Sequence, residues 1–166
     1  MPVSTLMDLF HETLRDVYWA EKHLLKALPR MAKKAGSDDL TKAFQSHHAE
    51  TEGHVERLEQ IFEMIDKPAR AKKCEAMVGL SAEADHVMKE VEEISVRDVG
   101  LIGAAQAVEH YEIARYGTLA AWAKQLGLDD AAALLVQTLE EEKAADEKLS
   151  TLSDSINAEA EMDEAA

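Results

Sequence analysis

Apolar residues recur every three or four positions along four long stretches of the chain, the spacing of an α-helix that buries one face. This pattern predicts long helices over residues 4–35, 39–65, 97–126 and 129–156. Gly36 and Gly127 follow the first and third stretches and are expected to end those helices. Ser37 and Asp129 are placed to cap the helices that come next. Pro29 lies inside the first stretch and is expected to kink that helix or shift its register.

The links between these helices differ greatly in length. Short links join the first helix to the second and the third to the fourth, whereas about thirty residues, 66–97, separate the second from the third. That connection holds a shorter amphipathic segment, with apolar residues Met77, Leu80, Val87, Met88, Val91 and Ile94. The connectivity predicts an all-α, ferritin-like four-helix bundle with one long crossover that carries a short extra helix. We expect residues 1–156 to form this bundle and the acidic, alanine-rich segment 157–166 to fray.

Composition agrees with one helical domain and indicates the cellular compartment of the protein. The chain has 166 residues, 46% of them apolar, with only 7 Gly and 3 Pro, which argues against a turn-rich β-sandwich. No apolar run approaches the roughly 20 residues of a membrane span. The first residues lack the basic start and apolar core of a signal peptide. Together with a single cysteine, Cys74, these features predict a cytoplasmic protein without an intrachain disulfide.

The chain is strongly acidic. Its net charge is −15, from 33 acidic and 18 basic residues, and Arg15 is the first basic residue. Such a surface repels nucleic-acid phosphate, so the sequence argues against a nucleic-acid partner. Most of the acids are expected to be solvated, and the informative ones are those at core positions.

Several carboxylates fall in columns of otherwise apolar residues. Residues seven apart stack along a bundle helix, and two neighbouring columns make its buried face. Glu21 stands between Leu14 and Leu28 in the first helix. Glu142 interrupts a fourth-helix column made of Leu128, Leu135, Leu149 and Ile156. An unpaired carboxylate in a core costs several kcal/mol, so these positions predict a counter-charge inside the bundle.

The other two long helices also place polar groups inward. Glu109 and Glu112 face the core from the third helix, and His54 shares a second-helix column with Leu40, His47 and Ile61. Glu50 precedes His54 by four residues, as Glu142 precedes Asp146, and this spacing puts both members of a pair on one face. We expect His47 to be a packed histidine or an outer partner of the site. Glu140 and Glu141 fall in polar columns and are predicted to be surface acids.

Charge balance predicts two metal ions rather than one. With a neutral His54, five acids carry five negative charges, which two divalent cations nearly cancel: Glu21, Glu50, Glu112, Glu142 and Asp146. No Lys or Arg lies in a buried column near their level. Glu109 is either a further ligand or an outer partner. An oxygen-rich donor set favours iron, with manganese as the alternative. The predicted metal ligands are Glu21, Glu50, His54, Glu109, Glu112, Glu142 and Asp146.

The two halves of the chain resemble each other weakly. Residues 17–21 superpose on 108–112, and residues 50–54 superpose on 142–146, as in a duplicated helix pair. In such a duplicated site Glu50 corresponds to Glu142, and both are predicted to be bridging carboxylates.

These residues also resemble the YciE/YciF family of bacterial ferritin-like proteins. The matching segments cover nearly the whole chain to about Leu152 and are LRDVYWAE (14–21), ETEGHVERL (50–58), CEAMVGL (74–80), QAVEHYEIARYG (106–117) and EEKAADEKL (141–149). The third-helix segment is the most specific of them. The resemblance implies a cytoplasmic, stress-associated homodimer with a di-metal centre, and kinship with rubrerythrins and ferritins implies ferroxidase activity.

Three functions fit these observations. The first is an oxidoreductase in which Fe(II) reacts with O₂ or peroxide. The second is a manganese site that disproportionates peroxide, and the third is a metal-binding stress protein without turnover. Iron storage is disfavoured, because nothing in the sequence identifies a cage-forming surface.

Overall fold

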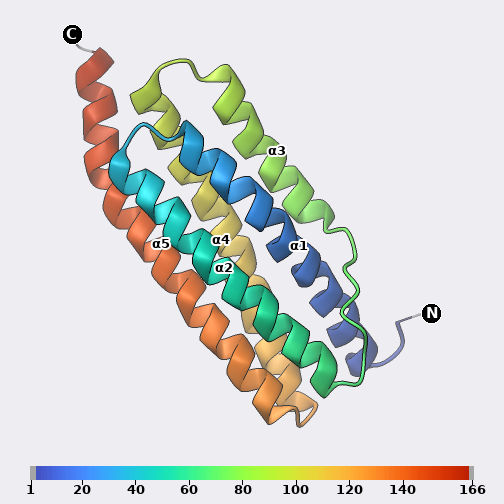
Figure 1. Cartoon of the computed structure of the whole chain (residues 1–166). Coiled ribbons are helices and arrows are strands. Elements are labelled where there is room, and N and C mark those ends of the chain that lie inside the picture. The colour runs from blue at the N-terminus through green and yellow to red at the C-terminus, as the bar shows by residue number, and fades with distance from the viewer. Residues whose placement is uncertain (1–2, 165–166) are drawn as a thin grey trace.

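The computed structural model describes residues 3–164, and all regular structure in this range is helical. The helices are α1 (Leu6–Lys34), α2 (Asp38–Met64), α3 (Glu75–Glu90), α4 (Ile94–Gln125) and α5 (Asp129–Glu164). The four long helices form a bundle in which α1 packs on α2, α2 on α5, α5 on α4 and α4 on α1, while α3 lies in the crossover against α1 and α4 (Figure 1). The predicted all-α bundle with one crossover and a short extra helix is therefore confirmed.

Local signals in the sequence set most of the helix ends. Thr5 and Asp8 form a reciprocal capping box at the start of α1, and the Ser37 side chain accepts a hydrogen bond from the backbone of Leu40 at the start of α2. Gly127 has a φ of 72°, a left-handed conformation that glycine adopts without strain, and it ends α4. Pro29 lies within α1 without ending it.

Two helices are longer than predicted. α4 begins at Ile94 rather than at residue 97, and α5 continues to Glu164 rather than ending at Ile156. Beyond Ile156 the chain contains no glycine or proline, and Ala158, Glu159 and Ala160 are strong helix formers. The segment predicted to fray from residue 157 is therefore drawn as helix up to Glu164, and Ala165 and Ala166 lie outside the described residues. None of the described helices is both long enough and apolar enough to cross a bilayer.

The apolar core is divided into two clusters along the bundle. One contains Leu24, Leu40 and Leu101, and the other contains Leu14 and Leu135 among its members. Each long helix contributes to both clusters and carries polar residues at the level between them. The fold thus holds a polar layer between two apolar layers, shielded from water at both ends.

A buried carboxylate of α4 holds the tight turn between α1 and α2. Asp98 is 3% exposed and accepts hydrogen bonds from the backbone nitrogens of Gly36, at 2.9 Å, and Ser37, at 2.7 Å. A Cβ atom on Gly36 would lie 2.0 Å from the Ile94 side chain, so any larger residue would require Ile94 to move. The contact fixes where α2 starts relative to α4 and so aligns the polar layer.

We expect Asp98→Ala to lower the free energy of unfolding by about 1–3 kcal/mol, because two backbone N–H groups of the turn lose their carboxylate acceptor. Urea unfolding of the purified variant measures this. The exposed Asp154 of α5 provides the control, since Asp154→Ala should change the free energy by no more than about 0.5 kcal/mol. Equal effects of the two variants would contradict this role of Asp98.

Candidate metal centre

Six polar side chains from the four long helices meet in the layer between the apolar clusters. Each is no more than 6% exposed. They are Glu21 from α1, His47 and His54 from α2, Glu109 and Glu112 from α4, and Glu142 from α5.

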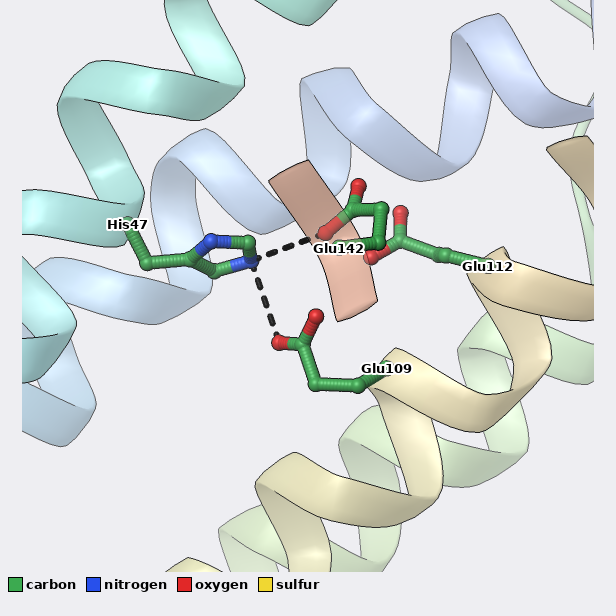
Figure 2. Close-up of side chains that lie close together, drawn as sticks. All are labelled: His47, Glu109, Glu112 and Glu142. Carbon is green, nitrogen blue, oxygen red and sulfur yellow. Dashed lines mark ion pairs between the residues drawn. The ribbon is translucent and has the colours of Figure 1, made fainter. Parts of the chain in front are cut away.

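These side chains form two groups that share Glu142. The first group is His47, Glu109, Glu112 and Glu142, and the second is Glu21, His54 and Glu142. Within each group, one donor atom from every member lies within 4.8 Å of the others. Figure 2 shows the first group, in which the His47 ring from α2 points between the carboxylates of α4 and α5.

The two carboxylate oxygens of Glu142 face different histidines. Oε1 lies 3.1 Å from His54 Nδ1, and Oε2 lies 3.7 Å from His47 Nε2. His54 Nδ1 is also 3.3 Å from Glu21 Oε1, and His47 Nε2 is 3.1 Å from Glu109 Oε1. Glu142 therefore has one oxygen on each half of the site, which is the arrangement of a bridging carboxylate.

Most of the donor atoms in this layer lack a hydrogen-bond partner. Among the described residues, no partner is found for Glu21 Oε2, His47 Nε2, His54 Nδ1, Glu109 Oε2, or either carboxylate oxygen of Glu112 and Glu142. Unpartnered buried polar atoms are rare in folded proteins, because each carries a desolvation cost of about 1–3 kcal/mol. Eight of them converge at one level, where their close contacts are the histidine–carboxylate approaches given above, and together they could bind a cation.

The donor set fits two metal ions. Four buried carboxylates with two neutral histidines carry four negative charges, which two divalent cations cancel. Four Glu and two His are also the donors of carboxylate di-iron and di-manganese sites in helix bundles, although here both histidines come from one helix. This buried group could therefore hold metal ions.

Proton affinities in the layer reflect the same crowding of negative charge. Burial raises the pKa of Glu142 to about 8, and the nearby Glu21 carboxylate adds to the rise. Burial likewise raises the pKa of Glu112 well above its usual range. Burial alone would lower the pKa of His54, but its contacts with Glu142 and Glu21 outweigh this and raise it to about 10. The metal-free layer thus holds protons that bound cations would displace.

Each histidine has an outer carboxylate on its other ring nitrogen. His54 Nε2 lies 3.0 Å from Glu141, and His47 Nδ1 lies 3.4 Å from Glu50. A carboxylate accepts a hydrogen bond, so these partners place the hydrogen on the outer nitrogen and leave the inner one free to bind a cation. Arg57 fixes Glu141 in turn by donating to both of its oxygens, at 2.8 and 2.7 Å.

The structure separates the seven predicted ligands into two classes. It brings Glu21, His54, Glu109, Glu112 and Glu142 together, whereas Glu50 and Asp146 belong to neither group. The Glu50 side chain is 42% exposed and lies 3.4 Å from Nδ1 on the outer side of the His47 ring. Asp146 is 20% exposed at its side chain and pairs with His110 at 3.1 Å. Both acids are more exposed than the six side chains of the buried layer.

Two residues have closer roles than the sequence predicts. His47, expected to be packed or an outer partner, contributes an inner donor atom to the first group. Its place seven residues from His54, in the same column, is the signal that could have identified it. Glu141, predicted to be a surface acid, turns inward to His54 and Arg57. Its neighbour Glu140 is 62% exposed at the side chain, as predicted.

A tyrosine also reaches the site. Tyr116 is fully buried and donates a short hydrogen bond from its hydroxyl to Glu21 Oε1. Burial raises the pKa of this hydroxyl well above its usual value, and the Glu21 carboxylate adds to the effect. Tyr116 therefore remains protonated and holds the Glu21 carboxylate in place.

We expect Glu141→Ala to weaken metal binding by about 10–100-fold, because His54 loses the partner that orients its ring. Anaerobic titration calorimetry of the metal-free protein with Fe(II) or Mn(II) measures this affinity. Glu140→Ala changes the adjacent exposed acid and should leave the affinity unchanged. Equal losses in both variants would indicate a general effect of surface charge instead.

Comparison with known proteins agrees with this architecture. Residues 5–161 match the family model described as "Domain of unknown function (DUF892)". The chain belongs to this family. It is 47% identical to Protein YciF of Escherichia coli over 163 residues, which cover 97% of this chain and 98% of YciF. The predicted kinship with YciF is therefore confirmed.

Solved structures of similar proteins have the same fold. The E. coli stress protein YciF superposes with a TM-score of 0.91 at 46% identity, over 94% of this chain and 99% of YciF. YcfI from Rhodopseudomonas palustris has a TM-score of 0.88 at 46% identity, over 90% of this chain and 95% of that protein. A Xanthomonas campestris protein at 20% identity has a TM-score of 0.77, over 98% of this chain and 100% of that one, and shares the fold alone.

Proposed function

We propose that this DUF892 protein binds two iron ions in its polar layer and oxidises Fe(II), with a peroxide or O₂ as the electron acceptor. The observation that carries the proposal is the convergence of unpartnered oxygen and nitrogen atoms from four glutamates and two histidines. Carboxylate-rich sites suit iron because anionic oxygen donors stabilise the additional charge of Fe(III).

Different side chains would hold the two metal positions. Glu21 and His54 hold one position, while His47, Glu109 and Glu112 hold the other. Glu142 is shared by the two positions, since one of its carboxylate oxygens faces each half of the site. Iron bound there supplies the electrons for reduction of an O–O bond. Tyr116 keeps Glu21 oriented, and the apolar clusters on both sides of the layer exclude water.

The proposal is tested with metal-free protein loaded anaerobically with Fe(II). On addition of H₂O₂ or O₂, Fe(III) absorbance should rise faster than in buffer, with two Fe(II) ions oxidised per chain in the first turnover. Continuous O₂ release from H₂O₂ with Mn(II) would instead indicate manganese-dependent disproportionation. Tight metal binding with no reaction above the buffer rate would indicate a metal-binding protein without turnover.

The biological setting is proposed from similarity. YciF of E. coli is described as a stress protein. Removal of Fe(II) and peroxide together limits the damage that their reaction causes, which agrees with a role of this protein in a stress response.

A further inference from the structure

A cavity leads from the surface to the first half of the candidate metal centre. It has a volume of about 140 Å³ and lies between α1, α2, α4 and α5. His47 and Glu109 form its inner end, and the exposed side chains of Glu50 and Lys148 lie at its outer rim. We call this space the His47 cavity.

The wall of the His47 cavity is mostly apolar. Seven of its twelve lining residues are apolar: Leu28, Ala43, Phe44, Ala105, Ala144, Ala145 and Leu149. Leu28, Phe44 and Leu149 are at most 5% exposed, so their side chains form a fixed surface rather than a solvated one. At the inner end, His47 Nε2 and Glu109 Oε2 have no hydrogen-bond partner among the described residues. The cavity therefore joins an apolar chamber to a polar end.

This shape selects among small oxidants. Hydrogen peroxide is polar and has no apolar group to pack against the mostly apolar wall of the cavity. O₂ occupies only a fraction of the volume, whereas an apolar cavity of about 150 Å³ accommodates a molecule as large as benzene. A molecule with a compact apolar body and one polar end matches both the chamber and its His47–Glu109 end.

We propose that the His47 cavity binds the organic group of a small alkyl hydroperoxide, and that this class of peroxide is the acceptor in the Fe(II) oxidation. The inference rests on the proposed function. The alkyl group lies against Leu28, Phe44 and Leu149, and the –OOH group lies at the inner end of the cavity, beside the metal position that His47 and Glu109 would hold. In the reaction the O–O bond breaks, each of two Fe(II) ions gives one electron, and two protons complete an alcohol and a water molecule.

Binding is tested first on the metal-free protein, so that the result does not depend on turnover. The probe is tert-butanol, the unreactive alcohol that corresponds to tert-butyl hydroperoxide, and saturation-transfer NMR follows its methyl signal. Ala105→Leu fills the chamber from α4 and should weaken binding by about tenfold or more. Ala145→Leu narrows it from α5 at a half-buried position, which keeps the test valid if the first variant folds poorly. Ala107→Leu, at an exposed site on α4, is the control and should bind as wild type does.

The same proteins are then loaded with Fe(II) and mixed with tert-butyl hydroperoxide or H₂O₂. Wild type should react faster with the organic peroxide, and the two cavity variants should lose this rate by about tenfold while keeping the H₂O₂ rate. Oxidation by H₂O₂ or O₂ without binding of tert-butanol, and without reaction with its hydroperoxide, overturns the cavity assignment and leaves the proposed function intact. No oxidation with any acceptor contradicts the proposed function, and the substrate assignment with it.

Discussion

Glu142→Gln is expected to remove most Fe(II) oxidation while the helical fold remains. Glutamine keeps the shape of the side chain but removes the negative charge, and only one of its two terminal atoms can accept a hydrogen bond or bind a cation. Because Glu142 is the residue shared by both groups, the loss affects both halves of the site. Loss of an outer partner costs about 10–100-fold in such sites, so loss of a shared inner one should exceed about 100-fold. Stopped-flow absorbance of Fe(III) formation measures the rate.

Two comparisons make this result specific. Glu147→Gln alters an exposed glutamate of the same helix and should oxidise Fe(II) at the wild-type rate. Circular dichroism should show equal helix content in all three proteins, because glutamine keeps the size and shape of Glu142 and so preserves its packing contacts. Equal rates above the buffer background in wild type and Glu142→Gln would mean that oxidation occurs outside this layer, and the site assignment would be wrong.

The fold was predictable because each of its signals is local. Apolar periodicity identifies the four long helices, and a capping serine at Ser37 and a left-handed glycine at Gly127 mark ends that the structure confirms. The missed extension of α5 has the opposite cause, since no local signal ends that helix. A run of alanine and glutamate continues a helix by propensity even where its apolar stripe is sparse.

The candidate site was only partly predictable, because a column of residues gives the direction of a Cβ atom and not the reach of the side chain. Glu21, Glu112 and Glu142 lie where their columns place them, in the buried layer. Glu141 lies in a polar column, yet its long side chain turns to His54 and is anchored by Arg57. Such a turn depends on the neighbouring helix, which a single column does not describe.

The weak internal repeat correctly predicted two similar helix pairs, but it did not predict which residues of the two pairs have equivalent positions in the site. It equates Glu50 with Glu142, but Glu142 is fully buried between the two groups and the Glu50 side chain is 42% exposed. Because α2 supplies both histidines and α4 supplies two glutamates, the layer has the donors of a symmetric site in an asymmetric arrangement. The asymmetry leaves the first half open to the His47 cavity, so the two halves of the candidate site differ in their access to small molecules.

The metal-free protein is expected to lose thermal stability as the pH rises from mild acid. The pKa of Glu142 is about 8 in the folded protein against an ordinary 4.5, so between these values the unfolded chain releases a proton that the folded chain keeps. Folding is therefore penalised progressively over that interval, and the raised pKa of Glu112 acts in the same direction. His54, with a pKa of about 10 against an ordinary 6.5, extends the loss to higher pH.

Addition of Fe(II) or Mn(II) should reverse this trend, because cations replace the protons and stabilise the ionised carboxylates. At a free metal concentration about 1,000 times Kd the stabilisation is about 4 kcal/mol. In a chain of this length that corresponds to a rise in Tm of roughly 8–16 °C. The rise should be largest near pH 7–8 and vanish near pH 4–5, where protons compete with metal for Glu112, Glu142 and the histidines. Anaerobic differential scanning calorimetry across this range, with and without a chelator, measures both curves. Melting temperatures that a chelator leaves unchanged at every pH would show that the buried acids do not hold metal.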